Sequence, residues 1–362
     1  MERTEPSTKL SLALGRMSRR VFVERIAKVA SAPLAALPTG SPTPRDCSVL
    51  AGSRIRLIVP HPPGGGYDRF GRLVAPLLGQ QLAARVVVDN VAGAGGTVGA
   101  NVLKTAPVDG KTIGILNSSG MLMASLLGGA PFPDPRTDFA LLGRIAPTPQ
   151  IWASRASSAL ENLDHVRAIA RKRPVLFALQ DIASTNFAGI VTSTHLLGIE
   201  ADFVSGYQGT RAMVLALLRD EVDLISISFD SLRGFIDSGE VNPILQITPQ
   251  RISPHDSLDG VPILPDASGP DPDDLQAPLL GLMELGRVLA APAGIPAHLR
   301  ECLEQNLFET LNTPRFLQAA AAAGMVVAPR SGAATREAMG RTADDALRLI
   351  PLIRVARRRA HE

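Results

Sequence analysis

Short apolar runs alternate with amphipathic stretches from residue 54 onward. The apolar runs are bounded by proline and glycine, as buried strands are, and the longer stretches repeat apolar residues every three to four positions, as one face of a helix does. The first part of this pattern predicts strands at 55–59, 86–88 and 113–116 and helices at 70–82 and 95–103. The order βαβαβ predicts a parallel sheet with helices on its faces.

The same alternation returns in the middle of the chain and near its end. It predicts strands at 175–179, 201–204, 224–228, 244–247 and 287–291 and helices at 161–172, 185–197, 209–219, 296–312, 314–323 and 333–350. The stretch 248–274 is rich in Pro, Asp and Gly and indicates a crossing between domains. Since 362 residues exceed one ordinary domain of ~100–200 residues, we expect two α/β lobes. The expected division is lobe 1 at 54–150 plus 273–355 and lobe 2 at 151–272.

The net charge of +3 comes from the ends of the chain. Residues 1–45 contain eight basic and three acidic side chains, and Arg357, Arg358 and Arg359 lie near the C-terminal end of the sequence. The long stretch between these ends is therefore acidic, which argues against nucleic acid as a partner. Ser18-Arg19-Arg20-Val21-Phe22 resembles a twin-arginine export signal, and an apolar stretch follows it. We expect residues 1–45 to be an export signal and linker; a helical or disordered extension is the alternative.

Two glycine-rich loops follow the first two strands. Gly64-Gly65-Gly66-Tyr67-Asp68 precedes one helix and Gly93-Ala94-Gly95-Gly96-Thr97 precedes the next. Glycine lets the backbone approach a ligand closely, and a helix N-terminus offers unpaired N–H groups with partial positive charge. The pair of loops predicts a carboxylate or phosphate site, although each loop alone could serve only as a tight turn.

The sequence lacks the motifs of several other functions. Gly71 is followed by Arg72-Leu73 instead of Lys and Ser/Thr, and Val98 stands where a dinucleotide fingerprint needs its third glycine, so ATP and NAD are not indicated. No nucleophile elbow, zinc motif or close His/Cys/carboxylate cluster is present in the sequence. We therefore expect no enzyme activity, no cofactor and no metal. Cys47 and Cys302 have no metal-ligand spacing, and the sequence does not decide whether they pair.

Several segments, in order, resemble one family of binding proteins. Residues 55–68 read IRLIVPHPPGGGYD, residues 88–100 read VDNVAGAGGTVGA, and shorter matches read DGKT at 109–112, VSGYQG at 204–209 and APAGIP at 291–296. These resemble the Bug family, the extracytoplasmic solute receptors of tripartite tricarboxylate transporters. The resemblance covers roughly residues 54–350.

The resemblance implies a periplasmic, monomeric, two-lobe binding protein of the type II Venus-flytrap class, which closes around a small organic carboxylate and delivers it to membrane permease subunits. Ligands of the family are held largely by backbone amides and hydroxyls. The positions that correspond here are Gly65, Gly66, Tyr67, Asp68, Ala94, Gly95, Gly96, Thr97, Ser118, Ser119, Ser184, Thr185, Asn186, Tyr207 and Gly209.

The chain departs from the family pattern at three places. Tyr67 replaces the usual Ser or Thr, Thr185-Asn186-Phe187 replaces a His-Leu pair, and Leu285-Gly286-Arg287 stands where an aromatic residue is usual. These changes concern the ligand rather than the lobes. Two other roles remain open: a sensor of the same fold that signals to a membrane kinase, and an α/β enzyme acting on a carboxylate.

Overall fold

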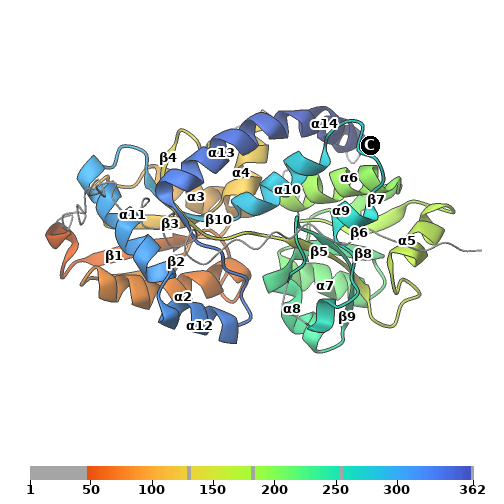
Figure 1. Cartoon of the computed structure of the whole chain (residues 1–362), viewed down its shortest axis with the longest axis horizontal. Helices are drawn as coiled ribbons and strands as arrows, with labels where there is room; N and C mark the ends of the chain where they lie inside the picture. Colours follow the sequence, from red (N-terminus) through yellow and green to blue (C-terminus); the bar gives the residue numbers. More distant parts are fainter. Residues whose placement is uncertain (1–46, 129–131, 181–183, 253–255, 360–362) are drawn as a thin grey trace, which may run out of the picture. The chain divides into compact units, whose positions relative to one another are not determined.

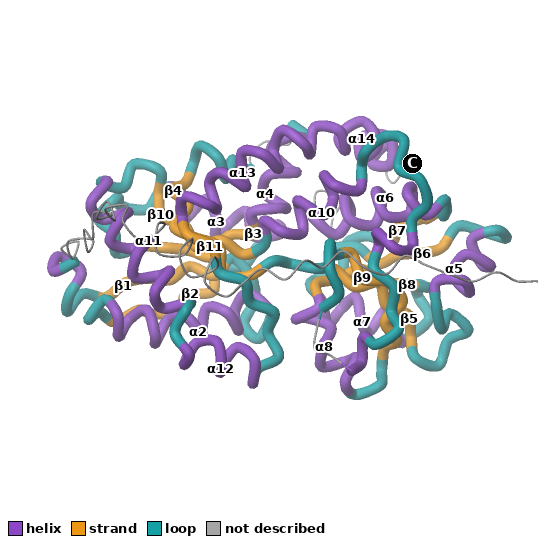
Figure 2. The backbone as a smooth tube through the Cα atoms, viewed as in Figure 1, coloured by secondary structure: helices purple, strands orange, loops and turns teal. Residues whose placement is uncertain are grey.

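The computed structural model describes residues 47–128, 132–180, 184–252 and 256–359, and residues 45–362 form one compact unit (Figure 1). The predicted export segment 1–45 lies outside the described residues. The strands form two mixed sheets, drawn in orange in Figure 2. Each sheet with its helices forms one lobe, so the two-lobe α/β prediction is confirmed.

The first sheet, sheet A, has the strand order β11-β4-β10-β3-β1-β2. Its strands are β1 (Arg54–Val59), β2 (Arg85–Asn90), β3 (Thr112–Asn117), β4 (Phe139–Ala146), β10 (Arg287–Pro292) and β11 (Arg330–Ser331). Strands β1, β2 and β3 are parallel, as the βαβαβ pattern predicts. Strand β10 enters between β3 and β4 and runs antiparallel to both, so the sheet as a whole is mixed rather than parallel.

Helices cover both faces of sheet A. They are α2 (Gly66–Gln81), α11 (Ala297–Leu311) and α12 (Pro314–Ala322) on one face, and α3 (Thr97–Lys104), α4 (Ser118–Leu126), α10 (Gln276–Leu285) and α13 (Gly332–Ala346) on the other. On the first face Phe70, Leu303 and Phe316 are fully buried against strand residues such as Leu57. Burial of this apolar surface, at about 25 cal/mol per Å², fixes where α2 begins relative to the end of β1.

The second sheet, sheet B, has the order β7-β6-β8-β5-β9. Its strands are β5 (Gln150–Arg155), β6 (Val175–Ala178), β7 (Ala201–Val204), β8 (Leu224–Ser228) and β9 (Val241–Ile247), and its helices are α5 (Leu163–Ala170), α6 (Thr185–Leu197), α7 (Thr210–Leu218), α8 (Phe229–Asp237) and the short α9 (Leu264–Ala267). As in sheet A, three strands are parallel (β6, β7 and β8), and β5 runs antiparallel to both of its neighbours, β8 and β9.

Helices near the C-terminus join the two sheets. Helix α10 packs on both α13 and α6, and the final helix α14 (Ile350–Arg359) packs on α6 (Figure 1). One apolar cluster therefore runs from Leu116 in sheet A through Leu279 and Met339 to Phe177 in sheet B. Among the described residues, no helix is both long and apolar enough to cross a membrane.

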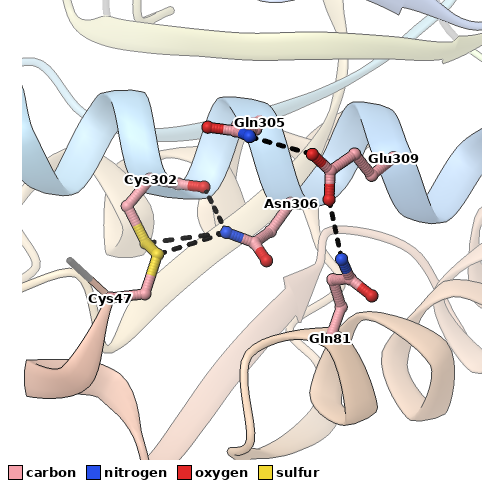
Figure 3. Close-up of a disulfide and its surroundings, with 6 residues drawn as sticks. All are labelled: Cys47, Gln81, Cys302, Gln305, Asn306 and Glu309. Carbon is pink, nitrogen blue, oxygen red and sulfur yellow. Dashed lines mark hydrogen bonds between the residues drawn. A yellow bond between two sulfur atoms is a disulfide. The ribbon is translucent and has the colours of Figure 1, made fainter. Parts of the chain in front are cut away.

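A disulfide joins Cys47 to Cys302 of α11, with the Cα atoms 5.8 Å apart (Figure 3). The Asn306 amide donates a hydrogen bond to the Cys302 carbonyl at 2.9 Å. The disulfide ties Cys47, the first described residue, to a helix residue 255 positions further along the chain. The sequence left this pairing open.

Most elements that the sequence analysis did not predict have a common cause; helix α8, of which only Phe229, Asp230, Leu232 and Ile236 are buried, is an exception. Strands β4 and β5 and helix α4 are almost entirely buried, and α10 is mostly buried. A segment buried on all sides reads as a continuous apolar run, which periodicity cannot assign to strand or helix. The predicted helix 333–350 also divides, because a 3-10 turn at Leu347–Leu349 separates α13 from α14.

Candidate functional site

Two adjoining cavities lie where the carboxyl ends of the parallel strands of both sheets meet helix starts. Their volumes are about 140 Å³ and about 60 Å³. Open α/β sheets bind ligands at this edge. The cavities share part of their lining, namely His61, Asn117, Gln180, Thr185 and Asn186.

Several helices begin at these walls. Lining residues at or next to a helix start are Gly65 and Gly66 of α2, Gly95 and Thr97 at α3, Asn117 and Gly120 of α4, Ser184, Thr185 and Asn186 of α6, Gly209 and Thr210 of α7, and Ser228 and Ser231 of α8. Each helix start has a partial positive charge and N–H groups without intrahelical partners. No Asp or Glu is among the described residues that line either cavity. The walls therefore favour an anion.

The loop before α2 is held by a buried carboxylate. Asp68 is 2% exposed, and its Oδ2 accepts hydrogen bonds from the Gly64 N–H and from Arg72 Nε, both at 2.8 Å. Its Oδ1 accepts one from Asn90 Nδ2 at 3.0 Å, and the same amide donates to the His61 carbonyl at 3.0 Å. Burial alone would raise the pKa of Asp68, but these hydrogen bonds and the nearby guanidinium lower it below its ordinary value. Asp68 thus fixes the first glycine loop to Asn90 at the end of β2, as an ionised group.

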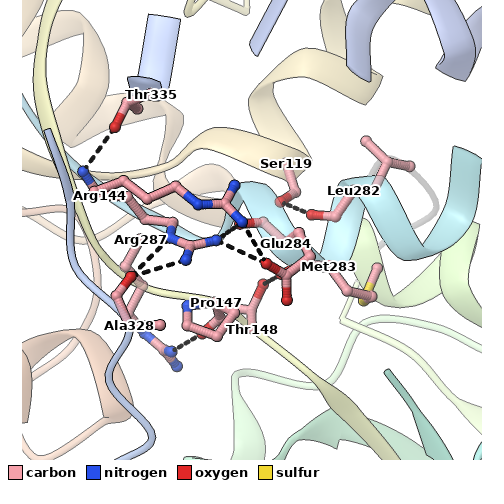
Figure 4. A network of polar contacts seen from close by, with 11 residues as sticks. Ser119, Arg144, Pro147, Thr148, Leu282, Met283, Glu284, Arg287, Ala328 and Thr335 are labelled. Atoms are coloured by element: carbon pink, nitrogen blue, oxygen red, sulfur yellow. Dashed lines mark hydrogen bonds and ion pairs between the residues drawn. The ribbon is translucent and has the colours of Figure 1, made fainter. Parts of the chain in front are cut away.

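A buried arginine forms part of the larger cavity's wall. Arg287, at the start of β10, is 0% exposed and donates from Nη1 to the Pro147 carbonyl at 3.2 Å (Figure 4). Nη1 also lies 2.8 Å from Oδ2 of Asp230 in α8. The guanidinium carbon is 5.0 Å from the ring centroid of Tyr67 and 4.7 Å from that of Phe70, close enough for cation–π attraction. A charge is therefore buried at the cavity with a counterion and two aromatic faces around it.

His61 stacks on Tyr67, with ring centroids 4.2 Å apart, and lines both cavities. Burial, together with the nearby Arg287 cation, lowers the pKa of His61 to about 4, so the ring is neutral at pH 7. Burial raises the pKa of Tyr67 to about 12, so the phenol keeps its proton. Both side chains therefore act as neutral hydrogen-bonding groups.

Nine of the residues that the resemblance selected line the cavities: Gly65, Gly66, Tyr67, Gly95, Thr97, Ser184, Thr185, Asn186 and Gly209. The others, Asp68, Ala94, Gly96, Ser118, Ser119 and Tyr207, do not. The hydroxyls of Ser118 and Ser119 are fully buried and donate to the carbonyls of Gly286 and Leu282. Tyr207 directs its hydroxyl to Glu221, at 3.3 Å. These side chains hold neighbouring elements together, which is why we leave them out of the proposed site.

Other lining residues escaped the sequence analysis. They are His61, Asn117, Gln150, Gln180, Ser228, Ser231 and Arg287, among others. Most lie at or just after the carboxyl ends of β3, β6 and β8 or at the starts of β5 and β10. His61 lies in a segment that resembles the family and Arg287 in one that departs from it, but neither was selected as a site residue. A signal existed for Asn117, because an Asn directly after a predicted strand is a common helix N-cap; its side chain accepts from the Gly120 N–H at 3.2 Å.

The family model described as "Tripartite tricarboxylate transporter family receptor" matches residues 70–354. The chain belongs to this family. Protein BugT of Bordetella pertussis is 28% identical over 275 residues, which cover 75% of this chain and 80% of that protein. A UPF0065 protein from the tcbD-tcbE intergenic region of Pseudomonas sp. strain P51 is 27% identical over 293 residues, 78% of this chain and 81% of the relative.

Solved structures of low sequence identity share the fold of this family receptor. The periplasmic binding protein BugD has a TM-score of 0.68 at 23% identity over 84% of this chain and 97% of its own. R. palustris Rpa4515, solved with adipate, has a TM-score of 0.71 at 21% identity, covering 83% and 97% of the two chains. MatC of Rhodopseudomonas palustris, solved with malate, has a TM-score of 0.67 at 19% identity, covering 83% and 99%. The family is one of solute receptors, so this receptor binds a solute rather than catalysing a reaction. Among its described residues, no group of His, Cys, Asp and Glu is placed to hold a metal ion.

Proposed function

We propose that this receptor captures a small organic carboxylate in the periplasm and delivers it to the permease of a tripartite tricarboxylate-type transporter. The observation that carries the proposal is the convergence of helix starts on cavities whose described walls contain one arginine and no carboxylate. Backbone dipoles that are already oriented stabilise a buried anion without reorganisation. A cavity of about 140 Å³ restricts the ligand to a small acid.

The test is differential scanning fluorimetry of purified receptor, lacking the export segment, with a panel of mono-, di- and tricarboxylates and with the amide of each acid. A ligand at 100 times its Kd stabilises the folded state by about 2.7 kcal/mol. We expect an increase in Tm with at least one acid and none with its amide. No increase with any acid, or an equal increase with the amides, would refute anion capture.

We further propose export by the twin-arginine route and cleavage of the signal within residues 1–45. The Cys47–Cys302 disulfide supports an oxidising compartment, where such bonds persist. Arg19→Lys/Arg20→Lys should keep the unprocessed protein inside the cell, as cell fractionation and immunoblotting would detect. Normal export of this variant would contradict the route but not the location.

We also propose that the receptor acts as a monomer and divides into lobe 1 (54–150 plus 273–355) and lobe 2 (151–272). The strands of sheet A and all but the first residue of sheet B fall within these ranges, which supports the division. The transport role is tested by deleting the gene of the receptor and measuring cellular uptake of the acid found in the fluorimetry panel. Uptake that does not change on deletion would refute the transport role.

A further inference from the structure

Arg287 is the only charged side chain among the described residues that line the two cavities, since the His61 ring is neutral. It belongs to the segment Leu285-Gly286-Arg287, which stands where the family resemblance led us to expect an aromatic residue. A buried arginine is costly unless its charge and its donors are satisfied. The partners of Arg287 therefore show which of its hydrogen-bond donors still lack an acceptor.

The hydrogen bonds of Arg287 are incomplete. A guanidinium has five N–H donors. Among the described residues, its acceptors are the Pro147 carbonyl, 3.2 Å from Nη1, and the Ser228 hydroxyl, 3.4 Å from Nη2. Nε has no acceptor, and the close contact from Nη1 to Asp230 Oδ2 is an ion pair without hydrogen-bond geometry. The guanidinium therefore keeps donors for a further acceptor.

The position of Nη2 shows where that acceptor would lie. A Cβ atom placed on Gly66 would be 3.2 Å from Nη2 and 3.1 Å from the Ser231 hydroxyl. Gly66 is the first residue of α2, so the unpaired N–H groups of a 16-residue helix open at the same point. Guanidinium, hydroxyl and helix start thus converge on a space that the absence of a side chain at Gly66 leaves free.

Asp230 contacts Arg287 but is not part of the cavity lining. Its Oδ1 accepts from the Val326 N–H at 3.0 Å, and its carbonyl accepts from Arg69 at 3.2 Å. These bonds hold Asp230, a residue of lobe 2, to two segments of lobe 1. It can therefore orient the guanidinium without competing for the ligand.

We propose that Arg287 determines specificity by binding one carboxylate of a dicarboxylate at the start of α2, with Asp230 as its positioning residue. The second carboxylate lies in the adjoining cavity against the starts of α3 and α6, near Gly95 and Thr185, since the two cavities share walls. This inference rests on the proposed capture of a carboxylate. It adds a charged side chain to a site that the resemblance assigned to backbone amides and hydroxyls.

The experiment is isothermal titration calorimetry with succinate, glutarate and adipate and with the mono-amide of each. A charge-assisted hydrogen bond is worth about 10- to 100-fold in affinity, so the wild-type receptor should prefer at least one diacid to its mono-amide by about that factor. In Arg287→Met/Asp230→Asn, which removes both charges together, the preference should fall to less than about threefold.

Two further variants leave the Arg287–Asp230 ion pair in place, so the test does not depend on whether the double variant folds. Gly66→Ala places a methyl group where the carboxylate would lie and should weaken diacid binding about tenfold or more, with the ion pair untouched. Gly234→Ala on α8, where a Cβ would meet nothing within 4 Å, is the matched control and should bind as the wild type does. Circular dichroism confirms that each variant is folded.

The outcomes separate the two proposals. If the wild type binds no acid in this panel or in the fluorimetry panel, carboxylate capture fails and this inference fails with it. If acids bind but the wild type does not distinguish a diacid from its mono-amide, or the double variant keeps the preference, or Gly66→Ala binds diacids normally, Arg287 is only structural. In each of these cases carboxylate capture itself stands.

Discussion

The Cys47–Cys302 disulfide should contribute strongly to global stability. It closes a loop with a sequence separation of 255 residues, nearly the whole described chain. Loop-closure entropy for a ring of this size amounts to about 5 kcal/mol. Native packing does not depend on the bond alone, because Leu50 and Cys302 are both fully buried. We therefore expect reduction to lower the free energy of unfolding by about 3–5 kcal/mol without changing the fold.

The assays are urea unfolding and thermal unfolding, both followed by far-UV circular dichroism, with oxidised protein compared with protein reduced by a phosphine. For a chain of this size 1 kcal/mol corresponds to roughly 1.5–2 °C in Tm, so Tm should fall by about 5–10 °C. Thiol titration confirms that both cysteines are free, and Cys47→Ser/Cys302→Ala provides a permanently open chain. If fully reduced protein stays within about 1 kcal/mol of the oxidised form, the loop-entropy reasoning is wrong.

The remaining predictions concern single residues of the site and its loops. The pKa of His61 in the folded protein is about 4, below the ordinary 6.5, so the unfolded chain binds a proton that the folded protein does not as the pH drops through 6.5. The free energy of unfolding of the wild type should therefore fall by about 2 kcal/mol between pH 7.5 and 5, and His61→Gln should remove this loss. Urea titrations at both pH values check this, and an unchanged pH dependence in the variant would contradict it. Asp68→Asn should lower the free energy of unfolding by about 1–3 kcal/mol at pH 7 and by less below pH 4, since a carboxyl with a lowered pKa loses its contribution as it becomes protonated. Thermal melts across pH 3–7 measure the difference between variant and wild type. No difference would mean that the Arg72 and Gly64 contacts are unimportant. Gly95→Val should weaken carboxylate binding, because Gly95 has φ +63° and a β-branched residue resists that conformation; calorimetry that gives the wild-type Kd would count against a ligand held by this loop.

Local pattern was enough to predict the elements that face both core and solvent. Helix α2 repeats its apolar residues from Phe70 to Leu82, and its burial follows that repeat. Strands β1, β2 and β3 are parallel because two helical crossovers separate them, and the glycine loops lie at the predicted edge. These features depend on neighbours a few residues apart in the chain, which is the range that sequence patterns report.

Which polar groups line the cavities and which hold the fold together became visible only in the folded chain. Asp68 and Ser118 belong to the predicted loops and strand ends, yet hydrogen bonds to Arg72 and to the Gly286 carbonyl occupy them. Arg287 is notable in the sequence only as part of a departure from the family pattern, and it lies far along the chain from Gly66, but the antiparallel entry of β10 beside β3 brings it to the cavity. The pairing of Cys47 with Cys302 depends in the same way on where α11 packs. Local pattern was therefore enough to predict an α/β receptor and the edge where its cavities lie, whereas long-range packing set the side chains that line them, because burial and partner choice depend on residues remote in the chain.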